Sequence, residues 1–220
     1  MFIGHYGPAF AAKAVVKTVP LWVLFVAAQW VDFLWAAFVI AGVEKVRLVE
    51  NFIGVTPLDL YYMPYTHGLP SAVLLSLFFG GVVALGVKGN KVAVVAAVAV
   101  TAFAHWLFDL IVHAPDLALV FDEMKVGMGL WAYPYISVPV EIALVLGGVW
   151  LYDRALPSPT RAGTIALWAL GFAMAALQVQ NSFFNEHPKE PAAFAMLSLT
   201  GYTVLALLAA GVDYLRRPRA

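Results

Sequence analysis

The stretch Thr101-Ala-Phe-Ala-His-Trp-Leu-Phe-Asp-Leu-Ile-Val-His113 lies inside an apolar run that is long enough to cross a membrane. It nevertheless carries His105, Asp109 and His113, which follow one another at intervals of four residues. A helix places side chains with this spacing on one face. A carboxylate in hydrocarbon costs about 3 kcal/mol on insertion scales, so Asp109 needs a partner. A metal ion is one such partner, and a histidine that ties two helices together through one hydrogen bond is the other.

The composition around this stretch is that of an integral membrane protein. Of the 220 residues, 63% are hydrophobic and 12% are charged, and the mean hydropathy is +0.85. A soluble domain is closer to half apolar and one quarter charged. Thirteen basic and thirteen acidic residues cancel, so no basic surface for nucleic acid is indicated. The absence of cysteine excludes disulfides, thiolate metal ligands and a cysteine nucleophile.

The predicted fold is all-α, a single membrane domain built as a polytopic bundle of transmembrane helices. Each span needs about 20 apolar residues, because backbone polar groups in hydrocarbon must be paired within the helix. Six stretches meet this need: Pro20–Val43, Gly68–Val87, Val92–Val112, Tyr133–Leu151, Gly163–Asn181 and Ala192–Tyr214. Residues 1–19 precede the bundle, and Lys13 and Lys17 predict a short interfacial helix over 8–19 whose lysines reach toward water. Residues 215–220 form a basic tail.

Basic residues in the connections predict how the bundle is oriented. Nine of them lie in the N-terminal segment, the second and fourth connections and the tail, and four lie in the other connections. This excess predicts that both termini are cytoplasmic. It also places most of the polar residues within the spans in one depth band on the outer side. These residues are His67, His105, Asp109, His113 and Glu141, with Asp32 near the middle of the first span.

Each of these polar residues also has a purely structural interpretation. Asp32 can pair with a Trp indole, His67 can bond to a helix end, and His113 can interact with the C-terminal dipole of its own helix. Glu141 is equally a paired core carboxylate. His5 stands between two glycines, which indicates either a fixed, tight backbone path or a flexible terminus.

Together, the histidines and aspartates indicate a metal site. Mixed imidazole and carboxylate ligands suit Zn²⁺, with Mn²⁺ or Fe²⁺ as alternatives. The predicted ligands are Asp32, His67, His105, Asp109 and His5. Such a site commonly keeps an open position, where a bound water is activated as hydroxide. We expect Glu141 or His113 to act as the catalytic base.

The order of these motifs resembles the membrane-bound metal-dependent hydrolase family, also described as LexA-binding, inner-membrane-associated hydrolases. Gly4-His5 matches the N-terminal histidine of that family, and Asp32 stands where the family has Pro-Asp-x-Asp. Thr66-His67 stands where it has His-Arg-Gly-x-Thr-His-Ser-Leu, and Ala104-His105-Trp-Leu-Phe-Asp109 where it has His-x-x-x-Asp. More distantly, the order is similar to zinc-dependent phospholipase C and P1 nuclease, all-helical enzymes that hydrolyse phosphate esters with a zinc cluster.

The resemblance covers the chain to about residue 125, and the sequence departs from the family pattern at three places. Asp32 is the single carboxylate where the family motif has two. Tyr62-Met63 stands in place of the family's His-Arg, and Gly68 stands in place of its Ser. These departures are compatible with a site for a single ion, or with a relic that keeps its shape without its chemistry.

Three functions fit these observations. The first is a membrane-embedded metal-dependent hydrolase, which the distant resemblance implies acts on phosphoesters of lipid or membrane-adjacent substrates. The alternative is a non-catalytic subunit that packs in or stabilises a larger membrane complex through its seven Trp and nine Tyr. The third is a small transporter or proton relay, because buried Asp, Glu and His also line ion paths. The expected partners are the lipid bilayer and other membrane subunits, and the expected location is the bacterial inner (plasma) membrane.

Overall fold

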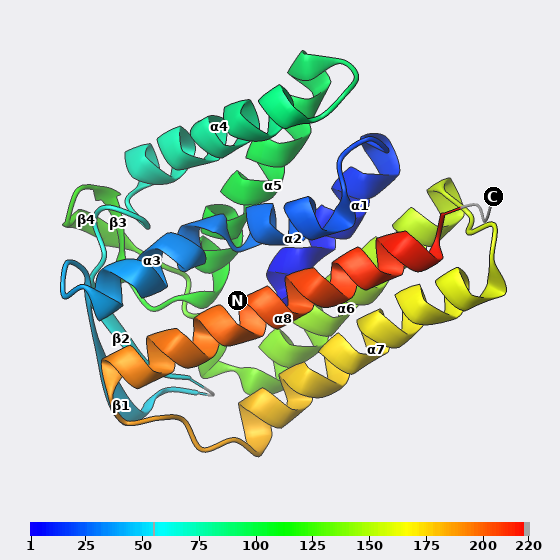
Figure 1. Cartoon of the computed structure of the whole chain (residues 1–220). Helices are drawn as coiled ribbons and strands as arrows, with labels where there is room; N and C mark the ends of the chain where they lie inside the picture. The colour runs from blue at the N-terminus through cyan, green and yellow to red at the C-terminus, as the bar shows by residue number, and fades with distance from the viewer. Residues whose placement is uncertain (55, 218–220) are drawn as a thin grey trace.

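The computed structural model describes residues 1–54 and 56–217 (Figure 1). Its helices are short near the N-terminus and long toward the C-terminus. The short elements are the 3-10 helices η1 (Ile3–His5) and η2 (Leu130–Ala132) and the α-helices α1 (Tyr6–Val15), α2 (Leu21–Ala28) and α3 (Trp30–Ile40). The long helices are α4 (Leu69–Gly86), α5 (Lys91–Val112), α6 (Pro134–Ala155), α7 (Arg161–Phe183) and α8 (Pro191–Leu215).

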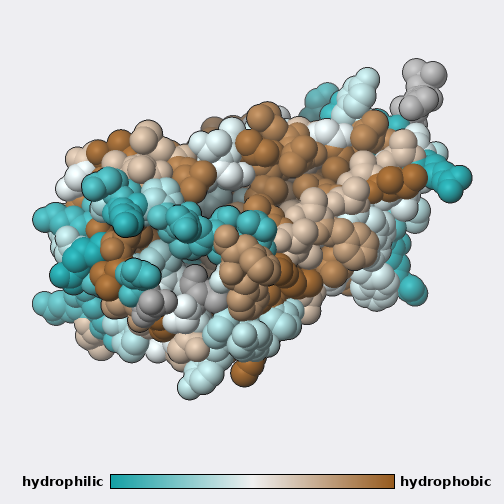
Figure 2. Space-filling view, turned by 90° about the horizontal axis from the view of Figure 1, so that it is seen from below, coloured by the Kyte–Doolittle hydropathy of each residue, from teal (hydrophilic) through white to brown (hydrophobic). Residues whose placement is uncertain are grey.

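Five helices, α4 to α8, are each long and apolar enough to cross a membrane. The pair α2 and α3 is a sixth candidate, bent by 55° at the break between the two helices. These lengths and compositions make the chain an integral, multi-pass membrane protein, as the composition predicted. Figure 2 looks onto the side that lies lowest in Figure 1, and it shows hydrophobic residues over the middle of the helices and hydrophilic residues toward both ends of the bundle.

The first predicted span is therefore not one straight helix. The stretch Pro20–Val43 breaks at Gln29, whose φ of −112° and ψ of 14° lie outside the helical region. No proline or glycine marks this position, so the sequence pattern predicted a continuous span. The break has a consequence for the site, because it leaves the carbonyl group of Ala28 available to a side chain.

Two antiparallel β-hairpins correct the all-α prediction. The first pairs β1 (Lys45–Ile53) with β2 (Thr56–Tyr62), and the second pairs β3 (Leu117–Val120) with β4 (Glu123–Val126). Both form in connections that are too polar to span a membrane, where Val46 and Leu48 alternate with charged neighbours and favour a strand. Val46 is buried in a cluster with Trp35 of α3. The hairpins and the α7–α8 connection lie at the same end of the bundle (Figure 1).

The N-terminal helix α1 packs inside the bundle, and its position relative to the membrane surface stays a prediction. Tyr6 and Phe10 are fully buried, and α1 packs on α6, α2 and α5. Lys13 is buried as well. Its Nζ donates hydrogen bonds to the carbonyl oxygens of Lys17 at 3.2 Å and Val19 at 2.8 Å, so its charge is satisfied inside the fold and not in water. An apolar ten-residue helix can pack among other helices or lie at the surface of the bundle, and its sequence pattern does not distinguish the two. The contacts with α6, α2 and α5 place it among the helices.

Close contact with α6 holds α1 in place. Gly7 and Gly148 lie against one another, and a Cβ added at Gly148 would come within 2.6 Å of the Gly7 carbonyl oxygen. Small residues let two backbones approach in this way. The contact carries η1, and with it His5, into the middle of the bundle. Met1 is buried beside α5, and α8 ends at the far end of the bundle from the hairpins (Figure 1).

Candidate metal centre

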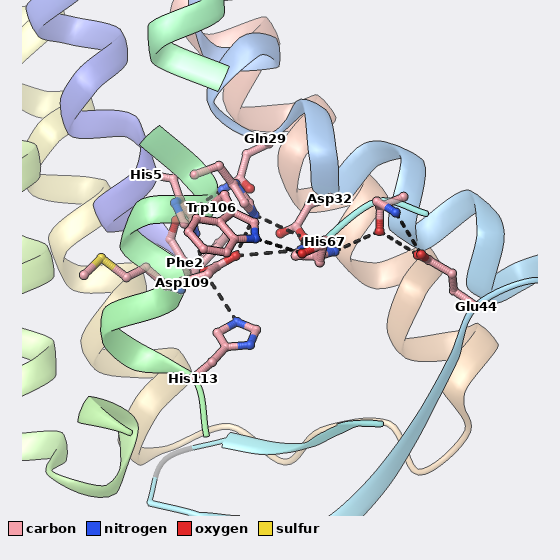
Figure 3. A network of polar contacts seen from close by, with 12 residues as sticks. Phe2, His5, Gln29, Asp32, Glu44, His67, Trp106, Asp109 and His113 are labelled. Atoms are coloured by element: carbon pink, nitrogen blue, oxygen red, sulfur yellow. Dashed lines mark hydrogen bonds and ion pairs between the residues drawn. The ribbon is translucent and has the colours of Figure 1, made fainter. Parts of the chain in front are cut away.

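The helix α5 supplies the centre of the site. His105 and Asp109 are both buried, and His105 Nε2 lies 3.0 Å from Asp109 Oδ2. His113 follows the last turn of the helix as its C-cap, with Nε2 3.4 Å from the other carboxylate oxygen, Oδ1. The face that the sequence predicted is thus formed, and both histidines contact Asp109. Figure 3 shows Asp109 and His113 on this helix.

The break between α2 and α3 places two further groups. His105 Nδ1 lies 2.8 Å from the carbonyl oxygen of Ala28, and since that oxygen only accepts, the ring must donate. Asp32 lies in the first turn of α3, where the helix dipole favours a negative charge. Its Oδ1 is 3.5 Å from His105 Nε2, and its Oδ2 accepts a hydrogen bond from the Tyr202 hydroxyl at 2.8 Å.

The loop before α4 brings His67 to the same point. Its Nε2 lies 3.3 Å from Asp32 Oδ1 and 3.7 Å from Asp109 Oδ2. On its other side, Nδ1 lies 2.8 Å from the Thr66 hydroxyl, which donates its own proton to Glu44 Oε2 at 2.6 Å. The hydroxyl therefore accepts from His67 Nδ1–H. This chain from His67 through Thr66 to Glu44 orients the ring (Figure 3).

His113 is oriented by a carboxylate of its own. Its Nδ1 lies 2.9 Å from Asp116 Oδ1, and its ring stacks on Trp131 with the ring centroids 4.4 Å apart. Burial lowers the pKa of His113, but the carboxylates of Asp109 and Asp116 raise it more, and the result is a pKa of about 9. The two carboxylates thus favour a cation at Nε2.

Because Nδ1 of each of these three rings is engaged by a hydrogen-bond acceptor, Nε2 of each ring is the atom that faces a carboxylate. A neutral ring in this tautomer and a carboxylate are both hydrogen-bond acceptors, so either a proton on Nε2 or a metal ion has to stand between them. The four distances that join His67 and His105 to Asp32 and Asp109 run from 3.0 to 3.7 Å. Ligands of a tetrahedral Zn²⁺ stand about 3.4 Å apart, given Zn–N and Zn–O bonds of about 2.0–2.1 Å. The donor set and its spacing fit a metal ion.

His5 joins the cluster from the N-terminal segment. Its ring stacks on His105 with the centroids 3.8 Å apart, and its Nε2 lies 3.1 Å from Asp109 Oδ1. The ring is fully buried and neither nitrogen has a hydrogen-bond partner. Burial, followed by the charge of His105, lowers the pKa of His5 to about 3, so the ring is neutral and offers a lone pair. The amino group of Met1 lies 2.7 Å from the same Asp109 oxygen.

Two overlapping groups of three donors could therefore hold a metal ion, and they share His105. The first is Asp32, His67 and His105, and the second is His5, His105 and Asp109. Within each group the ligand atoms all lie within 4.8 Å of one another. All five predicted ligands thus come together in the fold.

Glu141, the other predicted base, lies beside the cluster and contacts the N-terminal segment. Its Oε2 accepts hydrogen bonds from the backbone N–H groups of Phe2 at 2.8 Å and Gly4 at 3.1 Å. Gln29 adds a bond from its side-chain amide to the Phe2 carbonyl oxygen at 3.2 Å. These bonds hold the segment that carries His5.

Sequence reasoning did not identify Glu44, Asp116 and Tyr202, which bond to the predicted ligands. Glu44 stands beside Lys45 and Arg47, a context typical of a solvated connection. Only the spacing of Asp116, three residues after His113, is a signal that could have been used. Nothing in the sequence pairs Tyr202 of α8 with Asp32 of α3.

A cavity of about 250 Å³ adjoins the cluster. Its inner wall contains Asp32, His67, Asp109 and His113. The Asp32 side chain is 16% exposed while that of Asp109 is 2% exposed, so Asp32 is the more accessible of these two carboxylates. The ligand side chains are thus largely buried, and the adjoining cavity can admit a small molecule to them.

Searches against protein-family models, curated proteins and solved structures find no match to this chain. The resemblance in motif order to the membrane-bound metal-dependent hydrolases therefore stays a prediction.

Proposed function

We propose that this protein is a membrane-embedded, metal-dependent hydrolase that acts on phosphoesters of lipid or membrane-adjacent substrates. The observation that carries the proposal is the spacing of the ligand atoms: Nε2 of His67 and His105 faces Asp32 and Asp109 at distances of 3.0 to 3.7 Å. Zn²⁺ suits the ligands best, with Mn²⁺ or Fe²⁺ as alternatives.

The ligands would be Asp32, His67, His105 and Asp109, with His5 on the far side of Asp109. A divalent ion bound there would act as a Lewis acid and lower the pKa of a water molecule. Three of the ligand rings or carboxylates are themselves held by Ala28, Thr66 and Tyr202, which limits their movement.

We assign proton transfer to His113. His113 lines the cavity, and Asp116 accepts from Nδ1–H, an arrangement that orients an imidazole as a general base. Its Nε2 lies 3.4 Å from Asp109 Oδ1, beside the ligands of the ion. Trp131 covers one face of the ring. Glu141 is already engaged by two backbone N–H groups, and we assign it the role of positioning the N-terminal segment.

The substrate class follows from the similarity of the motif order to phosphate-ester hydrolases and from the location of the cavity among membrane helices. The test is hydrolysis of bis(p-nitrophenyl) phosphate by the protein purified in detergent, with added Zn²⁺, Mn²⁺ or Fe²⁺ and with a chelator. The variants are Asp109→Asn and His113→Gln, and Thr200→Val on the exposed face of α8 is the control.

We expect turnover that depends on metal. Loss of a general base costs about 10²- to 10⁴-fold in rate, so His113→Gln should lose activity while it keeps its metal. Asp109→Asn should lose both bound metal and activity, and Thr200→Val should keep both. Hydrolysis that persists in Asp109→Asn or with chelator would contradict the proposal. Bound metal without turnover on any phosphoester would favour the non-catalytic subunit.

A further inference from the structure

The cavity continues from the metal centre to the seam between α7 and α8. On α7 it is lined by Leu177, Gln178, Asn181 and Ser182, and just after the helix by Asn185. On α8 it is lined by Phe194, Leu197, Ser198, Gly201 and Tyr202. Each set recurs at intervals of three or four residues, so each forms one face of its helix, which extends for roughly 8 Å on α7 and roughly 12 Å on α8 at 1.5 Å per residue.

This seam lies between two helices that can cross a membrane. α8 packs mainly on α2 and α3, and α7 packs mainly on α6, while the contact of α7 with α8 is smaller. Leu177 and Leu197 line the cavity and are also exposed, at 37% and 55%. In a membrane these side chains face lipid, so the cavity reaches the bilayer from the side.

The two walls of the seam differ in chemistry. The α7 wall carries the amides of Gln178 and Asn181 and the hydroxyl of Ser182, which can bond to ester or hydroxyl oxygens. The α8 wall is formed by apolar and small residues, and a Cβ added at Gly201 would meet open space. A ligand that matches both walls has a polar part and an apolar chain.

We propose that a membrane lipid enters the cavity sideways between α7 and α8, with a phosphate headgroup at the metal centre and one acyl or alkyl chain along α8. The proposal rests on the proposed function, because the metal centre is what selects an anionic headgroup. It goes beyond that function by naming the chain as a recognised part of the substrate and the seam as its route.

The chain offers a matched pair of glycines for the test. Gly201 lines the cavity and Gly211 lies ten residues further along α8, away from the cavity lining, and a Cβ at either meets nothing within 4 Å. Gly201→Leu should fill the chain path, and Gly211→Leu adds the same side chain to the same helix outside the path. Ser198→Leu narrows the same wall one turn away and serves if Gly201→Leu does not fold.

The probe is dodecyl phosphate with a diazirine at the end of its alkyl chain, applied to the protein in nanodiscs and mapped by mass spectrometry. We expect labels on the seam faces of α7 and α8. Labelling there should fall several-fold in Gly201→Leu and stay unchanged in Gly211→Leu. Excess dodecyl phosphate should compete, and inorganic phosphate should not.

Labels spread evenly over the outward faces of α4 to α8, or unchanged labelling in Gly201→Leu and Ser198→Leu, would overturn the proposal. Competition by inorganic phosphate alone would also overturn it, because the headgroup and not the chain would then carry recognition. Failure of the hydrolase proposal gives a different result, namely seam labelling by the probe without hydrolysis of any phosphoester.

Discussion

His105 Nδ1 donates a hydrogen bond of 2.8 Å to the carbonyl oxygen of Ala28, at the point where α2 ends and α3 has not begun. A continuous helix would use that oxygen for the N–H group four residues later. The break thus fixes the tautomer of a ligand on α5. The same break starts α3, so that Asp32 falls in its first turn and faces His105.

Removing a hydrogen bond that orients a metal ligand should lower the affinity for metal. Thr66→Val keeps the shape of the side chain but removes the hydroxyl that links His67 to Glu44. We expect metal affinity to fall by about 10- to 100-fold, the usual effect of losing such a partner. Titration against a chromogenic chelator measures it. Thr200→Val removes a hydroxyl that bonds only to the Met196 carbonyl oxygen, and it should bind metal like the parent chain.

The contact between α1 and α6 predicts a contrast between neighbouring glycines. In Gly148→Ala the new Cβ meets the Gly7 carbonyl oxygen at 2.6 Å, whereas at Gly147 a Cβ meets nothing within 4 Å. We expect Gly148→Ala to lower the free energy of unfolding by about 1–3 kcal/mol through overpacking. Gly147→Ala should be neutral or slightly stabilising. Thermal melting in detergent compares them, and equal melting temperatures would show that α1 does not pack as described.

Removal of metal should lower stability. A ligand that binds the folded state at 100 times its Kd adds about 2.7 kcal/mol to the free energy of unfolding. We expect a chelator to lower the apparent melting temperature by about 5 °C or more for a chain of this size. Asp109→Asn should abolish the difference. A melting temperature that does not respond to chelator or added Zn²⁺ would argue against a bound ion.

Spacing on one helix was enough to predict the centre of the site. His105, Asp109 and His113 could be assigned to one face because a helix has a fixed period, and that face is observed. Asp32 and His67 could be grouped with them because polar side chains deep in apolar spans need partners.

What could not be predicted depends on tertiary contacts. The break at Gln29 has no proline or glycine to signal it, and a bond from another helix occupies the freed carbonyl oxygen. The burial of α1 depends on Gly7 meeting Gly148, which local pattern does not encode. Glu44 has the sequence context of a surface charge, and only the fold places it behind Thr66. The two hairpins lie in connections for which the sequence predicted only that they do not span the membrane.

The most direct test is the metal content of the protein purified in detergent without chelators, measured by mass spectrometry beside two variants. Asp109→Asn changes the carboxylate that four histidines approach, and His187→Ala removes the one histidine of the chain that lies outside the cluster. We predict about one or two transition-metal ions per chain in the parent and in His187→Ala, and loss of metal in Asp109→Asn. No metal in the parent chain, or equal metal in all three proteins, would contradict the central claim.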